Sequence, residues 1–129
     1  MNKRTEKPSR TIVVLGATGQ QGGAVTRALA ADGRWAIRTI SRTPDSDAAR
    51  RLSARGIEVV AADMDDSASL AAAFDGAYGV YSVQGTDQGG EVETRRGIAV
   101  ADAALAAGVE HFIQASVGGA DRRSGVPHF

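Results

Sequence analysis

The sequence predicts an α/β protein built on a doubly wound parallel sheet, with about five strands in the order 3-2-1-4-5 and helices on both faces. Three observations lead to this fold. Five short apolar runs alternate with four stretches of helical spacing. Such alternation implies right-handed βαβ crossovers and therefore parallel strands. A length of 129 residues fits one domain, and 43% hydrophobic with 23% charged residues excludes disordered, collagen-like and coiled-coil chains.

The first strand and helix carry the clearest pattern. Residues 11–15 form a nearly continuous run of β-branched and apolar side chains, which is typical of a strand covered on both faces. The run stops at Gly16, and a glycine-rich turn follows. Apolar residues then recur at helical spacing from Ala24 to Leu29, and Gly33 provides a signal for the end of the helix.

The same cycle then repeats along the chain. Each later helical stretch is followed by a glycine, at Gly56, Gly76 and Gly108. The further elements that we predict are a strand over 35–41, a helix from Pro44 or Asp45 to about Ala54, a strand over 57–62, a helix capped by Asp66 or Ser67 and running to Phe74, a strand over 78–83, a helix over about 91–107 and a strand over 111–115. Residues 1–10 are expected to form a disordered tail, and 116–129 show no clear period.

Charge and composition give no sign of nucleic-acid or membrane binding. Lysine plus arginine equals aspartate plus glutamate at 15 each, so no net field attracts nucleic acid or an anionic membrane. Cysteine is absent, which excludes disulfides and thiolate chemistry within this sequence. The first ten residues contain no apolar stretch of the signal-peptide kind, and no apolar run approaches the ~20 residues that span a bilayer. We expect a cytoplasmic protein that binds neither nucleic acid nor membrane.

The turn after the first strand indicates nucleotide binding. Its glycines fit the spacing G-x-x-G-x-x-G at Gly16, Gly19 and Gly22, a variant of the dinucleotide fingerprint. The first glycine permits the tight exit from the strand, the second lets a diphosphate approach the backbone, and the third lets the helix pack on the strand. Free N–H groups at the helix N-terminus would face the phosphates, and Thr18, Gln20 and Gln21 can add side-chain donors. A turn needed only for chain reversal would explain Gly16 but not the other two.

The end of the second strand favours NADP over NAD. NAD sites carry an acidic residue there for the ribose 2′-hydroxyl, whereas this chain has Ser41 and Arg42. An arginine can bind a 2′-phosphate through charge-assisted hydrogen bonds. Arg38 is a second, weaker candidate for this contact. NAD stays the alternative cofactor, and a solvated surface side chain is the alternative for Arg42.

Polar residues at the ends of later strands are the remaining candidates. Asp63 can accept from the adenine amino group and Met64 can cover the ring, while helix capping is the alternative reading of this acidic segment. Gln84, after the fourth strand, would border the nicotinamide ribose, because strand ends line the ligand crevice of such sheets. Arg95 and Arg96 open the long helix and are interpreted as a solvent-facing pair, with contact to a cofactor phosphate or a partner as the alternative. The two histidines do not form a metal site.

The motifs together resemble those of the NmrA-like family, a branch of atypical short-chain dehydrogenases/reductases. They are Gly-Ala-Thr-Gly-Gln-Gln-Gly-Gly at 16–23, Ser-Arg at 41–42, Asp-Met-Asp-Asp at 63–66 and Val-Pro-His-Phe at 126–129. The resemblance implies a Rossmann domain over 11–129 followed, in family members, by a smaller substrate region. It also implies one of two functions: an NADP-sensing regulator that binds protein partners, or a reductase of quinones or similar small molecules.

The chain departs from the reductase pattern in its catalytic groups. Reductase relatives carry a lysine shortly after the segment that matches 127–129, whereas the lysines here are Lys3 and Lys7. The Tyr-x-x-x-Lys pair of ordinary short-chain dehydrogenases is also absent from the sequence. Ser116 matches the usual catalytic serine position, but alone it could only border the nicotinamide. No catalytic residue is therefore assigned.

These departures lead to two functional expectations, beside a third hypothesis of an inert remnant that binds no adenine nucleotide. The first is an NAD(P)-binding, NADP-preferring module that acts as a dinucleotide binder or redox sensor. The alternative is an NADP-dependent reductase whose catalytic part lies in a longer parent chain, of which this sequence looks like the cofactor half. Whether the chain is an enzyme is left open. The fifth strand would be an unprotected sheet edge, so we also expect homo-oligomers through that edge or through the 91–107 helix.

Overall fold

The computed structural model describes residues 10–84 and 89–115, and within them strands and helices alternate as the sequence predicts. Most of the expected tail and all of 116–129 lie outside the described residues, and Arg10 already belongs to the first strand. The elements are β1 (Arg10–Val14), α1 (Gln20–Asp32), β2 (Trp35–Ser41), α2 (Asp47–Ala54), β3 (Glu58–Ala61), α3 (Ser67–Phe74), β4 (Gly79–Ser82), α4 (Gly90–Ala106) and β5 (His111–Gln114).

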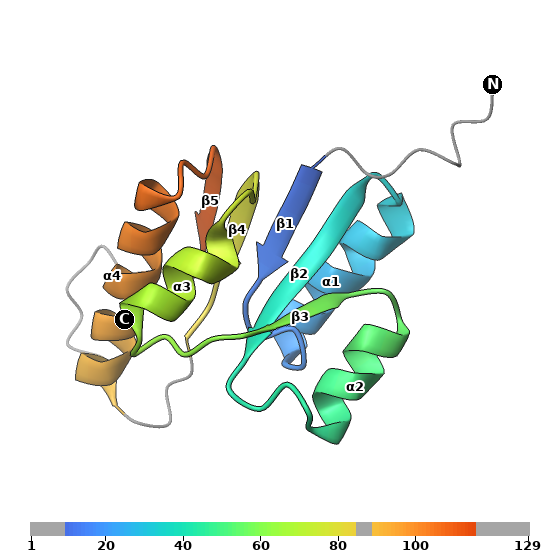
Figure 1. The fold of residues 1–129 in the computed structure, drawn as a ribbon, viewed down its shortest axis with the longest axis horizontal. Coiled ribbons are helices and arrows are strands. Elements are labelled where there is room, and N and C mark those ends of the chain that lie inside the picture. Colours follow the sequence, from blue (N-terminus) through green and yellow to red (C-terminus); the bar gives the residue numbers. More distant parts are fainter. Residues whose placement is uncertain (1–9, 85–88, 116–129) are drawn as a thin grey trace.

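The five strands form one parallel sheet in the order β3-β2-β1-β4-β5, which confirms the predicted order (Figure 1). The order reverses direction between β1 and β4, because the chain first builds outward from β1 to β3 and then returns to the other side of β1. In sheets of this kind the crevice at the carboxyl ends of the strands beside the reversal is where ligands bind.

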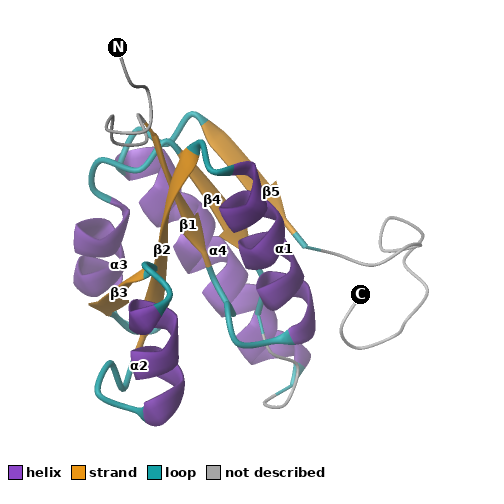
Figure 2. Ribbon diagram, turned by 90° about the vertical axis from the view of Figure 1, so that its right-hand side faces the viewer, coloured by secondary structure: helices purple, strands orange, loops and turns teal. Residues whose placement is uncertain are grey.

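Helices cover both faces of the sheet (Figure 2). On one face α3 and α4 bury a cluster that includes Leu70, Phe74 and Val100, each fully buried. On the other face α1 and α2 pack over Val14 and Ile37. Both faces of β1 are therefore apolar, which explains why its sequence shows an almost continuous apolar run rather than an alternation.

Local signals set the helix ends. The Ser46 side chain accepts a hydrogen bond from the Ala49 N–H, so α2 begins after Ser46 and not at Pro44 or Asp45 as expected. Asp66 accepts from two N–H groups at the start of α3, which confirms it as the capping residue. Gly33 ends α1 with a φ of 78°, a conformation that favours glycine. None of the helices in the described residues is long and apolar enough to cross a lipid bilayer.

Candidate dinucleotide-binding site

The glycine-rich turn between β1 and α1 is built so closely that two of its positions exclude a side chain. Gly16 has a φ of 65°, and its carbonyl accepts a hydrogen bond from the Gly19 N–H at 2.8 Å. A Cβ at Gly22 would lie 2.1 Å from the Gly16 oxygen, so α1 can start this near to β1 only because residue 22 is glycine. At Gly19 a Cβ would lie 3.3 Å from the same oxygen, which is a milder conflict.

The N-terminus of α1 has backbone N–H groups that donate no hydrogen bond within the described residues. Gly19 is the N-cap and has no side chain to accept a hydrogen bond, and the first turn contains no acidic residue. In the described part of the chain the N–H groups of Gln20, Gln21 and Gly22 have no acceptor, since the first bond of this turn runs from Gly23 to Gly19. These N–H groups and the positive end of the helix dipole together suit an anion such as a diphosphate.

One side chain of the turn is oriented by a residue that the sequence did not single out. The Tyr81 hydroxyl, on β4, donates a hydrogen bond to Gln21 Oε1 at 3.2 Å. This contact leaves the Gln21 amide nitrogen able to donate to a ligand. Thr18 and Gln20 are exposed beside it. The two residues that meet are 60 positions apart, so only the pairing of β4 with β1 brings them together.

The end of β2 lies beside this turn, since β2 is the neighbour of β1 in the sheet. Ser41 Oγ accepts from the Thr43 N–H at 3.0 Å, which shapes the turn that carries Arg42. Arg42 is exposed, and its guanidinium forms no ion pair or hydrogen bond within residues 10–84 and 89–115. It therefore remains a candidate for the 2′-phosphate.

Arg38 is excluded from the 2′-phosphate contact. Its guanidinium donates to Glu58 Oε1 at 2.8 Å and to the carbonyl oxygens of Ala73 and Asp75 at 2.8 and 3.0 Å. All three acceptors belong to β3 or the end of α3. The side chain therefore fastens α3 to the sheet, and the expectation that it is a second phosphate ligand is wrong.

The segment after β3 is ordered by its own hydrogen bonds. Asp63 Oδ1 accepts from the Asp65 N–H at 2.9 Å, and the Asp63 N–H donates to Ser69 Oγ at 3.0 Å. Met64 is half-buried and packs against the core beneath α3 and α4. Asp63 and Met64 thus lie at the carboxyl edge of the sheet, and their contacts with an adenine stay a prediction.

Arg96 does not face solvent as expected. Its side chain is 14% exposed and forms two hydrogen bonds with the Asp65 carboxylate, at 2.9 and 3.1 Å. Arg95 is 63% exposed and reaches the same carboxylate at 3.4 Å. Hydrogen bonds and the positive charge of Arg96, with a smaller contribution from Arg95, lower the pKa of Asp65 from 3.8 to about 2.

Two glutamine side chains and a serine hydroxyl are joined by hydrogen bonds at the end of β4. Gln84 Nε2 donates to Ser82 Oγ at 2.7 Å, and Gln84 Oε1 accepts from Gln114 Nε2 of β5 at 2.8 Å. A Cβ at Gly97 would lie 3.1 Å from Gln84 Oε1, so α4 packs closely against the Gln84 side chain. The Gln84 side chain is thus used to join two strands, and a contact with the nicotinamide ribose stays a prediction. Ser116 lies outside the described residues.

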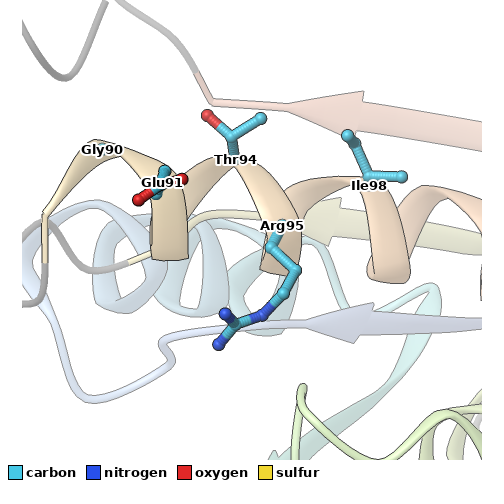
Figure 3. Close-up of a pocket in the computed structure, with 5 residues that line it drawn as sticks. All are labelled: Gly90, Glu91, Thr94, Arg95 and Ile98. Atoms are coloured by element: carbon cyan, nitrogen blue, oxygen red, sulfur yellow. The ribbon is translucent and has the colours of Figure 1, made fainter.

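Two surface hollows lie away from the glycine-rich turn. One, of about 660 Å³, runs along the outer side of α4 and is lined by Gly90, Glu91, Thr94, Arg95 and Ile98 (Figure 3). The other, of about 430 Å³, is an apolar groove between α1 and β5 that includes Trp35, Tyr78 and Ile113. Among the described residues no group of three His, Asp or Glu side chains could hold a metal ion.

Comparison with known proteins identifies the family. The model of the NmrA-like family matches residues 8–129. The chain belongs to the NmrA-like family. Similar curated relatives include the NmrA-like family domain-containing oxidoreductase FrzB of Cladobotryum, 41% identical over 111 residues, which cover 81% of this chain and 33% of FrzB. An NmrA-like family domain-containing protein of Dictyostelium discoideum is 36% identical over 117 residues, 90% of this chain and 39% of that protein. The chain spans about a third of the length of the curated relatives that it matches.

Solved structures of the same architecture include both reductases and a regulator. Triphenylmethane reductase of Citrobacter, complexed with NADP(H), is 31% identical with a TM-score of 0.66, covering 81% of this chain and 36% of its own. The NADPH-dependent quinone oxidoreductase of Escherichia coli, complexed with NADPH, is 34% identical with a TM-score of 0.69, covering 85% and 38%. NmrA, a negative transcriptional regulator, is 25% identical with a TM-score of 0.75, covering 92% and 37%.

Proposed function

We propose that this NmrA-like chain binds NADP or NADPH across the carboxyl edge of its sheet and acts as a dinucleotide-binding, redox-sensing module. The observation that carries the proposal is the start of α1, where three backbone N–H groups lack acceptors within the described residues. A Cβ at Gly19 would approach no side chain, only the Gly16 carbonyl oxygen at 3.3 Å. The triphenylmethane reductase, 31% identical to this chain, is complexed with NADP(H), and the quinone oxidoreductase, 34% identical, is complexed with NADPH. Both support the same cofactor here.

Preference for the phosphorylated cofactor rests on Arg42. This exposed guanidinium follows the strand next to the glycine-rich turn and has no competing carboxylate partner in the described residues. A charge-assisted contact with the 2′-phosphate favours NADP over NAD by about 10- to 100-fold. Ser41 and Thr43 hold the turn that presents it.

The decisive experiment is calorimetric titration of the chain with NADPH, NADP, NADH and NAD. We expect tighter binding of the two phosphorylated forms. Gly19→Val should abolish this binding, since its side chain would occupy the approach of the diphosphate, while the extended backbone at Gly19, with φ −85° and ψ 178°, accepts a β-branched residue. Circular dichroism checks that the variant is folded. Equal affinity of the variant and the wild type for NADPH would remove the phosphate-loop assignment.

A second titration tests the cofactor preference separately. Arg42→Asp should shift the preference toward NADH, because the new carboxylate repels a 2′-phosphate and can accept from a 2′-hydroxyl. The matched control is Arg50→Asp, an exposed arginine on α2 that is not part of the site. A ratio of NADPH to NADH affinity that does not change in Arg42→Asp would refute the role of Arg42.

The second candidate function is an NADP-dependent reductase of a quinone or a similar small molecule. The similarity to a quinone oxidoreductase and to FrzB favours it, whereas the similarity to a transcriptional regulator favours the sensing function. In the reductase case we propose that residues 11–129 form the nucleotide-binding domain and that the catalytic and substrate-binding groups come from other sequence of a longer protein. The assay that separates the two functions is made on the longer protein: binding of NADPH without its oxidation by added quinones would support the sensing module, and turnover would support the reductase.

A further inference from the structure

The loop between β3 and α3 is fastened to α4 by an ion pair that the proposed function has not used. Arg96 Nη2 and Nε lie 2.9 and 3.1 Å from the two carboxylate oxygens of Asp65. This two-pronged geometry fixes direction as well as distance, because the guanidinium and the carboxylate are both planar. The Arg96 side chain is 14% exposed and the Asp65 side chain 41%, so the guanidinium is largely covered while the carboxylate still meets solvent.

The same loop is also held from inside. Asp63 accepts from the Asp65 N–H, and Ser69 Oγ accepts from the Asp63 N–H and lies 2.8 Å from the Asp66 carbonyl oxygen. Asp66 caps the first turn of α3. The loop is thus tied to its own helix by short-range contacts, and the Asp65 carboxylate supplies the connection to α4.

The Asp65–Arg96 pair connects two sides of the crevice at the carboxyl ends of the strands. The loop lies at the carboxyl end of β3, at one margin of the sheet, and the first turns of α4 lie at the carboxyl end of β4, beyond the reversal of strand order. Asp65 and Arg96 are 31 residues apart and join these two sides through the packing of α3 on α4. The proposed dinucleotide lies in the crevice at the carboxyl ends of the strands, and its adenine is expected to contact Asp63 and Met64 of this loop.

We propose that Asp65 is a positioning residue for the adenine half of the dinucleotide: bound by Arg96 of α4, it holds the loop of residues 63–66 in its binding conformation before the ligand arrives. The inference rests on the proposed function. A loop that is already ordered costs less conformational entropy when the ligand binds. Asp65 does not itself contact the ligand in this proposal. It fixes the positions of Asp63 and Met64, which contact the adenine.

The test separates the adenine half from the phosphate loop. Asp65→Asn is titrated by calorimetry with adenosine 2′,5′-bisphosphate and, separately, with inorganic pyrophosphate. We expect the affinity for adenosine 2′,5′-bisphosphate to fall about two- to fivefold, the range of a measured exposed ion pair, while pyrophosphate binding stays unchanged. Arg96→Lys keeps the charge but loses the two-pronged contact, and it should show a smaller loss of the same kind.

A matched ion pair elsewhere provides the control. Asp32, the last residue of α1, pairs with Arg34 at 2.6 Å, away from the crevice. Asp32→Asn should leave both titrations unchanged. Equal losses for both probes in Asp65→Asn, or no loss for either, would overturn the positioning role. If the wild type binds neither probe, the proposed function itself fails and takes this inference with it.

Discussion

Two glycines of the same turn are needed for different physical reasons. Gly22 is required by the fold, because a Cβ there would meet the backbone oxygen of Gly16 at 2.1 Å. The fold does not require Gly19, because its backbone is extended and a Cβ there would lie 3.3 Å from the same oxygen, a milder conflict. The proposed ligand requires it, because a side chain would occupy the approach of the diphosphate. The regular spacing of the glycines therefore has two causes: Gly22 is needed for folding and Gly19 for ligand binding.

Substitution of Gly22 tests this division. Gly22→Ala should lower the free energy of unfolding by about 3 kcal/mol, since the added methyl group forces α1 away from β1. Gly23→Ala is the control, because its Cβ meets the flexible Arg27 side chain at 3.3 Å and alanine favours the helix by about 0.5 kcal/mol or more. Urea unfolding followed by circular dichroism measures both, and similar stability of the two variants would contradict the close approach of Gly22.

The Asp65–Arg96 pair gives a prediction for the dependence of stability on pH. The folded chain holds the pKa of Asp65 at about 2, below the ordinary aspartate value of 3.8. A lowered pKa means that the stabilisation is present above the unfolded value and is lost as pH falls through the folded value. The stability difference between wild type and Asp65→Asn should thus stay constant from neutral pH to about 5 and shrink between about 4 and 2. Urea midpoints at each pH measure it, and a difference that grows on acidification would contradict the sign.

At the scale of the element, helix caps decide where the shorter helices begin. α2 and α3 have eight residues each, a length at which an isolated helix is marginal in water. Ser46 and Asp66 accept from the first free N–H groups of these helices. Arg38 adds a contact at the opposite end of α3, where it donates to the Ala73 and Asp75 carbonyl oxygens.

Removal of the α3 cap should be measurable. Asp66→Ala is expected to lower the free energy of unfolding by about 1 kcal/mol, since two N–H groups lose their acceptor. Asp66→Ser can accept the same hydrogen bonds and should recover most of the loss. Thermal unfolding of the two variants distinguishes them, and an equal loss in both would show that the cap geometry is not what stabilises α3.

At the scale of the whole molecule, the two faces of the sheet are covered unequally. α3 and α4 lie over one face, while α1 and α2 cover the other face mainly at β1, β2 and β3. β5 is the last strand of the described sheet, and all four of its residues are exposed. Its sequence, His-Phe-Ile-Gln, contains no lysine or proline of the kind that protects edge strands.

We expect this edge to support self-association. Ile113→Lys should reduce oligomer formation in sedimentation velocity at high protein concentration, because a charge on the edge disfavours pairing with another strand. Leu105→Lys, on the outer side of α4 where Leu105 is 81% exposed, tests the alternative helix surface. The variant that yields monomers identifies the surface. A wild type that sediments only as a monomer would contradict self-association altogether.

Most of the fold could be predicted from the sequence because its signals are local. The apolar runs, the caps and the glycines at helix ends each depend on a few neighbouring residues, and the strand order follows from the handedness of βαβ units. The predicted start of α2 was two or three residues early, since Ser46 competes with Pro44 and Asp45 as a start signal and only the hydrogen bond to Ala49 decides between them.

The sequence by itself determined the alternation of strands and helices and the glycine turn that makes a diphosphate site possible, because backbone sterics and hydrophobic period act within one or two turns of chain. Only the tertiary structure decided the partners of the long side chains. Tyr81 meets Gln21 across 60 residues, and Arg96 meets Asp65 across 31. Flexible polar side chains pair with whatever the packed helices and strands bring within reach, and that proximity exists only after the layers have assembled.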